Sequence, residues 1–256
     1  MKIVAFIQAR MSSSRLPGKV LKDLFGEPMI FRQIDRLKKS KLLTDIVVVT
    51  SLDRSDDILV EECMRRGVQI FRGSLDNVLD RFYQAQQLYV SDYCVRITAD
   101  CPLLDWDVVD LVVARHVENI VDYTSNTLKP TFPDGLDVEV FSPNLIEKIM
   151  SEITTDIEKE HVTYYCHTHQ DEFTLLNVNN PNGDQSYYRW TVDNFEDYEF
   201  VCAVYRGLYE VNPDFNSKDI MDYLGENEEI YIINKHQIRN GALKKSLLME
   251  GSSEKL

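Results

Sequence analysis

The sequence predicts an α/β fold built on a mostly parallel β-sheet with helices on both faces. Continuous β-branched runs such as residues 46–50 are typical of strands that are covered on both sides. Segments with apolar residues at helical spacing, such as residues 29–41, alternate with these runs after short connections. This order of strand, helix and strand favours parallel pairing.

Length and composition are compatible with one large domain. The 256 residues are 44% apolar, which is ample for a buried core. We expect a single domain over residues 1–235, with a β-rich insertion at about 122–185. Residues 236–256 are predicted to be a partly disordered tail, because their last stretch lacks periodicity.

The charge balance and the cysteines indicate which partners and which cellular compartment to expect. With 28 basic and 42 acidic residues the net charge is −14, which opposes binding to nucleic acid or to an anionic membrane. The five cysteines form no C-x-x-C pair, so we expect free thiols in a reducing compartment. No apolar stretch approaches the roughly 20 residues of a membrane span, and no signal peptide is recognisable. A soluble, cytoplasmic protein is expected.

A cationic loop follows the first predicted strand. Residues 3–7 form a buried strand, and the serine-rich stretch after it contains Arg10, Arg15 and Lys19. Small residues let backbone N–H groups approach phosphate oxygens, while arginine and lysine provide charged donors. We therefore predict a polyphosphate site here; the alternative is a solvated surface loop.

The next elements continue the α/β alternation. A helix is predicted to begin at residues 55–57 and to end at Gly67, followed by a third strand over residues 68–71. At the end of this strand, Arg72 and Asn77 could face a nucleotide or could have a purely structural role.

Asp100 follows the fourth predicted strand, residues 93–97, at the edge where doubly wound sheets bind ligands. The structural alternative for Asp100 is a cap on the helix that starts near Asp105. Asp105-x-Asp107 resembles a metal-binding D-x-D, but its position at a helix start favours capping.

The pattern changes from Asp122, where two strand-like segments, residues 123–126 and 136–141, flank a turn-rich stretch. We expect this insertion to bind a second substrate, which is called the acceptor below. The candidate acceptor-binding residues are Asp134, Asp137, Glu139 and His161.

A predicted helix from about residue 158 contains Cys166, His167 and His169. We do not predict a zinc site here. A helix spreads these side chains and His161 around its circumference, so they cannot converge on one metal ion.

Residues 187–192 are predicted to be a last core strand that ends at Asp193. Like Asp100, Asp193 would then directly follow a core strand at the ligand-binding edge of the sheet. Helices are expected from Phe195 to about Tyr209 and from about Asn216 to Leu224.

The loop motif resembles a known family. Ala9-Arg10-x-x-Ser13-x-Arg15-x-Pro17-Gly18-Lys19 is similar to the signature loop of cytidylyltransferases that activate 3-deoxy-2-ulosonic sugar acids. Residues 96–102 and 189–197 resemble the SpsF-type branch, which is associated with spore-coat and surface polysaccharide synthesis. The similarity extends over about residues 1–224.

This resemblance implies a Rossmann-like nucleotidyltransferase fold, CTP as donor, Mg²⁺ and a homodimer. Our hypothesis is transfer of CMP from CTP to a hydroxyl of a small acidic sugar, with release of pyrophosphate. The predicted catalytic residues are Arg10, Arg15, Lys19, Asp100 and Asp193, the last two binding the metal. The predicted nucleotide-binding residues are Gln8, Ala9, Arg10, Ser13, Arg15, Lys19, Arg72, Asn77 and Asp100.

Three departures from the sugar-acid enzymes leave the acceptor open. Thr98-Ala99 replaces the family's Gln-Gly, Cys101 replaces an acidic residue, and the sugar-acid-binding segment is not recognisable. The alternatives are a cytidylyltransferase for a phosphonate or phosphorylated alcohol, a glycosyltransferase that consumes a nucleotide sugar, and a non-catalytic nucleotide-binding subunit.

Overall fold

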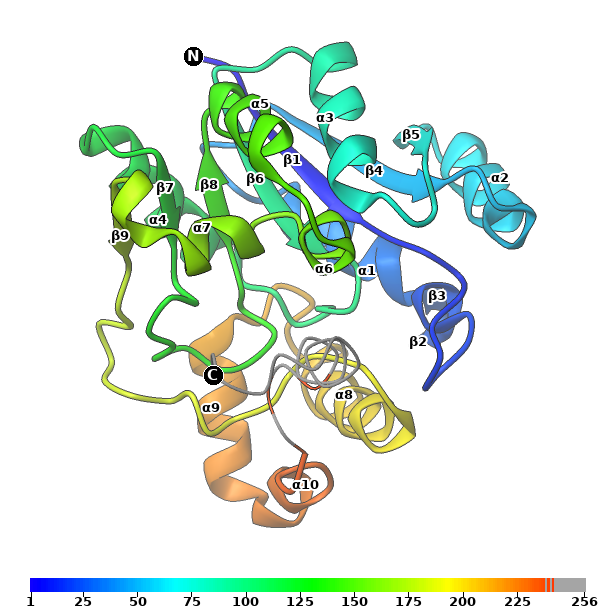
Figure 1. The fold of residues 1–256 in the computed structure, drawn as a ribbon. Coiled ribbons are helices and arrows are strands. Elements are labelled where there is room, and N and C mark those ends of the chain that lie inside the picture. The colour runs from blue at the N-terminus through cyan, green and yellow to red at the C-terminus, as the bar shows by residue number, and fades with distance from the viewer. Residues whose placement is uncertain (238, 240, 242–256) are drawn as a thin grey trace.

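A central β-sheet organises the chain in the computed structural model, which describes all residues except 238, 240 and 242–256. Within this described part the sheet has seven strands in the order β5-β4-β1-β6-β8-β7-β9 (Figure 1). The strands are β1 (Ile3–Gln8), β4 (Asp45–Ser51), β5 (Gln69–Gly73), β6 (Tyr93–Thr98), β7 (Tyr123–Ser125), β8 (Glu139–Phe141) and β9 (Leu175–Asn177). A separate small ribbon pairs β2 (Asp23–Leu24) with β3 (Glu27–Pro28).

The sheet is mostly parallel, as predicted. β1 pairs in parallel with β4 and β6, and β4 pairs in parallel with β5. β8 is antiparallel to both β6 and β7, while β7 and β9 are parallel. The strands predicted for the insertion thus extend the central sheet instead of forming a sheet of their own.

Helices cover both faces of the sheet, because alternate side chains of the inner strands are buried in two different cores. In β1, Ala5 and Ile7 belong to the core on one face, and Val4 and Phe6 belong to the core on the other. The α-helices are α1 (Met29–Leu37), α2 (Asp57–Arg65), α3 (Val78–Leu88), α4 (Trp106–Glu118), α5 (Pro143–Glu152), α6 (Asp156–Glu160), α7 (Tyr164–Thr168), α8 (Phe195–Leu208), α9 (Ser217–Glu226) and α10 (Glu228–Ile232). Short 3₁₀ turns occur at Lys19–Leu21, Arg54–Asp56 and Gln170–Glu172.

The predicted strand over residues 187–192 is wrong. The segment is extended, but only Arg189 makes a bridge, which is parallel and pairs with Asp134. Its remaining backbone bonds are not to a strand: the Tyr188 N–H donates to the carbonyl of Gln185 at 3.1 Å, and the Val192 N–H donates to the carbonyl of Asp100 at 2.8 Å. The apolar residues of this segment are buried although the segment is not part of a sheet; Trp190, for example, is fully buried.

The helix predicted from about residue 158 is divided into α6 and α7. Thr155 and Glu158 form a capping box that begins α6, and the chain leaves the helical conformation at His161 before α7 begins. The last stretch of the predicted tail, residues 246–256, lies outside the described residues. Within the described residues, none of the helices combines the length and the apolar character that crossing a membrane requires.

Candidate active site

An open pocket of about 460 Å³ lies where β1 and β6 end. It brings together nine residues that the sequence predicted for the site: Gln8, Ala9, Arg10, Ser13, Arg15, Lys19, Asp100, His161 and Asp193. Other walls come from Ser14, Val20, Val78, Arg96, Thr98, Ala99, Glu160 and Gly241. The pocket is therefore formed by the cationic loop, the end of β6, α6 and the segment before α8.

The cationic loop is anchored to the end of β4 by Asp56. This carboxylate is fully buried, and it accepts hydrogen bonds from the Met11 N–H at 2.6 Å and from the Thr50 hydroxyl at 2.9 Å. The carbonyl of Met11 in turn accepts from the Gly18 N–H at 2.9 Å. Gly18 has a φ of 69°, a left-handed conformation that glycine adopts without strain. The sequence assigned Asp56 only to a helix start, so its role in holding the loop was missed.

Lys19 lies between the two predicted metal-binding aspartates. Its ammonium nitrogen is 2.8 Å from Asp100 Oδ2 and 3.0 Å from Asp193 Oδ1, and it donates to the carbonyl of Val192 at 2.7 Å. Burial would lower the pKa of Lys19, but the two carboxylates together raise it above its ordinary value. Burial would likewise raise the pKa of Asp100, and the Lys19 ammonium holds it at about 2. Both groups are therefore charged at neutral pH, and both carboxylates converge on one point.

Asp193 is positioned by two arginines and by the start of α8. Arg15 Nη2 is 2.8 Å from Asp193 Oδ1, and Arg189 Nη2 donates to Asp193 Oδ2 at 2.9 Å. The Asp193 N–H donates to Asp197, which is fully buried and forms the capping box of α8 with Asn194. These contacts place a carboxylate beside Asp100 without a strand.

The capping interpretation of Asp100 is wrong. The side chain of Asp105 caps α4 by accepting from the Asp107 N–H at 2.8 Å, as the sequence predicted for that pair. Asp100 lies outside this cap and directs its carboxylate toward Lys19.

The opposite end of the pocket contains a second charged network. Arg96 Nη1 donates to Glu139 Oε2 at 2.5 Å, and Arg96 Nη2 donates to Gln8 Oε1 at 2.9 Å. Glu139 also accepts from the hydroxyls of Tyr123 and Thr163, each at 2.7 Å. Burial raises the pKa of Glu139, but Arg96 and these hydroxyls bring it below its ordinary value. Glu139 is thus an ionised residue behind the pocket wall, and Arg96 is the residue exposed to the pocket.

His161 and Arg10 complete this end of the pocket. Arg10 Nη2 is 3.8 Å from Glu160 Oε1, and the imidazole of His161 lies beside the same glutamate. Burial lowers the pKa of His161; Glu160 opposes this shift, whereas Arg96 and Arg10 reinforce it.

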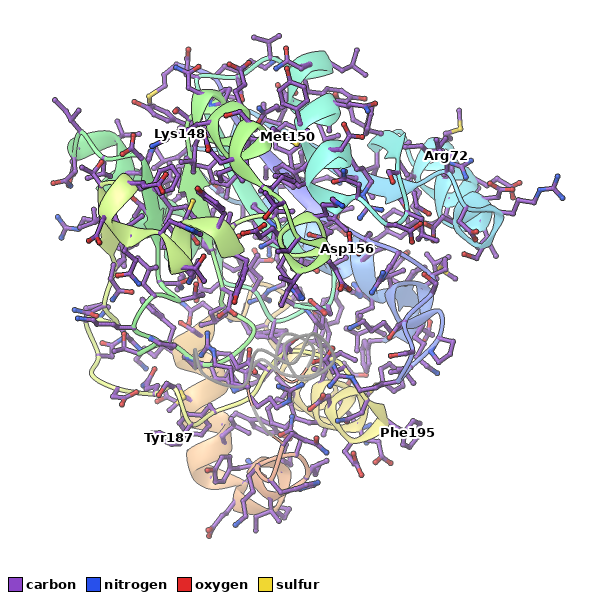
Figure 2. The ribbon with its side chains drawn as sticks, viewed as in Figure 1. Arg72, Lys148, Met150, Asp156, Tyr187 and Phe195 are labelled. Atoms are coloured by element: carbon purple, nitrogen blue, oxygen red, sulfur yellow. The ribbon has the colours of Figure 1, made fainter. Side chains whose placement is uncertain are left out.

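Four of the predicted residues do not line the pocket and have structural partners instead. Arg72 lies in the part of the molecule formed by β5 and α2 (Figure 2). Its guanidinium contacts Asp57 of α2 at 2.8 Å. Asn77 caps α3 by accepting from the Asp80 N–H. Asp134 is paired with Arg189 at 2.7 Å, and Asp137 is paired with Arg239 at 2.5 Å.

Sequence reasoning missed Arg96, Glu160 and Arg189 as parts of the site. A signal was available for Arg96, because an arginine inside a predicted core strand needs a partner or a ligand. No comparable local signal exists for Glu160, which looks like any exposed residue of a helix.

The fold and the site together define a class of protein. A cationic loop after the first strand faces two carboxylates at the carboxyl edge of a parallel sheet, which is the arrangement of a nucleotidyltransferase of the α/β type. Residues 4–232 match the family model described as cytidylyltransferase. The chain belongs to this cytidylyltransferase family.

Relatives and solved structures agree with this assignment. The chain is 33% identical to the spore coat polysaccharide biosynthesis protein SpsF of Bacillus subtilis over 233 residues, covering 89% of this chain and 95% of that protein. It is 28% identical to the 3-deoxy-manno-octulosonate cytidylyltransferase of Chloroherpeton thalassium over 149 residues, covering 58% and 59% of the two chains. A cytidylyltransferase structure from Leptospira borgpetersenii superposes with a TM-score of 0.86 at 32% identity, covering 93% of this chain and 98% of that one.

Proposed function

We propose that this cytidylyltransferase transfers CMP from CTP to a hydroxyl of an acidic sugar of the 3-deoxy-2-ulosonic acid class, in surface polysaccharide or glycoconjugate biosynthesis. The names of two relatives support this, one a cytidylyltransferase for 3-deoxy-manno-octulosonate and the other a protein of spore coat polysaccharide biosynthesis. The observation that carries the proposal is the pocket itself, in which a chain of net charge −14 gathers Arg10, Arg15, Lys19 and Arg96.

The two ends of the pocket suit the two anionic substrates. Arg15 and Lys19 lie beside Asp100 and Asp193 and would hold the triphosphate. The acceptor oxygen then attacks the α-phosphorus, the bond from this phosphorus to the oxygen that bridges to the β-phosphate breaks, and pyrophosphate leaves with the bonding electrons. The cations stabilise the charge that develops on the leaving pyrophosphate. The hydroxyl proton passes to solvent. Because the acceptor attacks the α-phosphorus directly, no covalent enzyme intermediate is needed.

The two aspartates fit Mg²⁺, which we propose as the cofactor. Asp100 and Asp193 offer hard oxygen ligands. Both contact the Lys19 ammonium, and this shared contact supports our proposal that their oxygens can share one cation. Mg²⁺ typically takes one or two protein carboxylates together with substrate phosphates. Bound there, it would polarise the α-phosphate and would free Lys19 to contact the phosphates.

Pyrophosphate release with CTP, MgCl₂ and a panel of acceptors tests the proposal. The panel comprises 3-deoxy-manno-octulosonate, other 2-keto sugar acids, a phosphonate and a phosphorylated alcohol. Release with a sugar acid alone would support the proposal. Release with the phosphonate or the phosphorylated alcohol alone would keep the cytidylyl transfer and contradict the acceptor.

A further inference from the structure

Arg96 is carried by a strand of the central sheet, whereas the other cations of the pocket are carried by a loop. Of the four lysine and arginine residues that line the pocket in the described part of the chain, Arg10, Arg15 and Lys19 belong to the loop after β1. Arg96 comes from β6, and its side chain is only 15% exposed. A charged side chain this deep in a sheet needs either a purely structural partner or a ligand.

The orientation of Arg96 is fixed before any ligand binds. Glu139 and Gln8 each accept from one of its terminal nitrogens, and Glu139 is itself held by Tyr123 and Thr163. The Nε atom of Arg96 is buried without a hydrogen-bond partner. The guanidinium is thus pre-organised, and its donors are not fully used by the protein.

Two further guanidinium groups lie near Arg96, and carboxylates offset their charge: Glu139 pairs with Arg96 and Glu160 lies 3.8 Å from Arg10. Arg81 is fully buried behind the pocket, and its Nε and Nη2 atoms have no hydrogen-bond partner. Burial and the neighbouring Arg10 lower the pKa of Arg81 to about 10; Asp56 opposes this shift and Arg96 adds to it. The charges of Arg10 and Arg96 thus reach the buried Arg81, and an anionic group bound beside Arg96 would be stabilised by this neighbourhood.

We propose that Arg96 is a specificity-determining residue that receives the acidic group of the acceptor, an inference that rests on the proposed function. The triphosphate is assigned to the end where Arg15 and Lys19 face the two aspartates. Two anionic substrates that react in one pocket are accommodated best when separate cations neutralise them. Arg96 and His161 line the rest of the pocket, where Glu160 lies beside both Arg10 and His161.

The test compares wild type with Arg96→Gln and Arg96→Lys. The probes are 3-deoxy-manno-octulosonate and its C1 carboxamide, which differ only in the acidic group. Wild type should prefer the acid, and Arg96→Gln should lower kcat/KM for the acid by roughly 10- to 100-fold while the amide reacts as before. Arg96→Lys should recover part of the preference for the acid, because lysine keeps the positive charge but lacks the paired N–H donors of a guanidinium. The KM for CTP should change less than about twofold in both variants.

Arg36→Lys is the matched control for the loss of a buried guanidinium. Arg36 is buried away from the pocket, against Trp106 and Phe215, so this change should lower stability without altering the acid-to-amide ratio.

Two outcomes would overturn the role of Arg96 while leaving the proposed function intact. In one, Arg96→Gln keeps the wild-type preference for the acid; in the other, it weakens CTP binding as much as acceptor binding. A wild type that uses no acidic acceptor at all would reject the proposed function and the role of Arg96 together.

Discussion

At the scale of single residues, the charge balance of the site depends on Lys19, which pairs with two carboxylates. Lys19 serves two carboxylates at once, and its side chain is almost entirely buried. Removing it would leave two neighbouring anions without their common cation. Such an uncompensated pair is far more costly than a lost surface ion pair.

For this reason Lys19→Ala should affect both binding and stability. We expect CTP affinity to fall by roughly 10- to 100-fold, because a charge-assisted hydrogen bond is lost. We also expect the free energy of unfolding at pH 7 to fall by about 3 kcal/mol, and MgCl₂ to restore part of it by taking the place of the ammonium. Thermal melting with and without MgCl₂ measures this, and unchanged CTP affinity would contradict the phosphate role.

Asp100→Asn and Asp193→Asn should abolish magnesium-dependent turnover while the fold persists. An amide oxygen is a weaker metal ligand than a carboxylate, and we expect a loss on the order of 100-fold or more. The rate of pyrophosphate release against MgCl₂ concentration is the measurement.

Asp107→Asn is the control for these two variants. Asp107 is the second carboxylate of the D-x-D-like pair, at the start of α4, and its replacement should leave turnover near normal. Loss of turnover in this control, or full activity in either Asp100→Asn or Asp193→Asn, would reject the two-carboxylate site.

At the scale of elements, the segment of residues 187–192 shows how a buried segment can be held without belonging to a sheet. It is held against the turn at Gly135, where a Cβ atom would lie 2.6 Å from the Thr191 nitrogen and 2.7 Å from the Trp190 carbonyl carbon. Gly135 also has a φ of 111°. The segment carries Asp193 into the site, so the close approach at Gly135 is linked to catalysis.

Gly135→Ala should therefore lower both stability and turnover. We expect a loss of about 2 to 4 kcal/mol in the free energy of unfolding, from the backbone conformation and the clash together. Gly183→Ala is the matched control, because Gly183 has a φ of 91° but no atom within 4 Å of the added Cβ. Chemical denaturation should show a clearly smaller loss for Gly183→Ala, and equal losses would contradict the role of the contact.

At the scale of the whole molecule, a buried histidine makes stability depend on pH. His116 in α4 is 2% exposed, and its Nδ1 atom lies 2.9 Å from the Thr124 hydroxyl oxygen in β7. Burial lowers the pKa of His116 to about 4. Between pH 6.5 and 4 the unfolded chain binds a proton that the folded protein excludes, so stability falls as the pH falls through this range.

This contribution should reach about 3 kcal/mol at pH 4. In His116→Asn that part of the pH dependence should be absent, because asparagine does not titrate. Urea denaturation of both proteins at several values between pH 4 and 7 checks the difference. Parallel stability curves would show that other groups control the acid sensitivity.

The sequence by itself determined the elements whose cause is local. The strands β1, β4, β5 and β6, the cationic loop after β1 and the position of Asp100 follow from apolar runs and from where those runs end. These features depend on residues that are close in sequence, so periodicity and composition reveal them.

Only the tertiary structure decided how the charges pair and where the second carboxylate comes from. Lys19 bonds Asp100 and Asp193, which are 81 and 174 positions away, and Arg96 bonds Glu139, which is 43 positions away. Local periodicity carries no information about such pairs. They form because charged groups at the carboxyl edge of the sheet need partners there. The strand order decides that Arg96 meets Glu139, and the contacts of a segment outside the sheet bring Asp193 to Lys19.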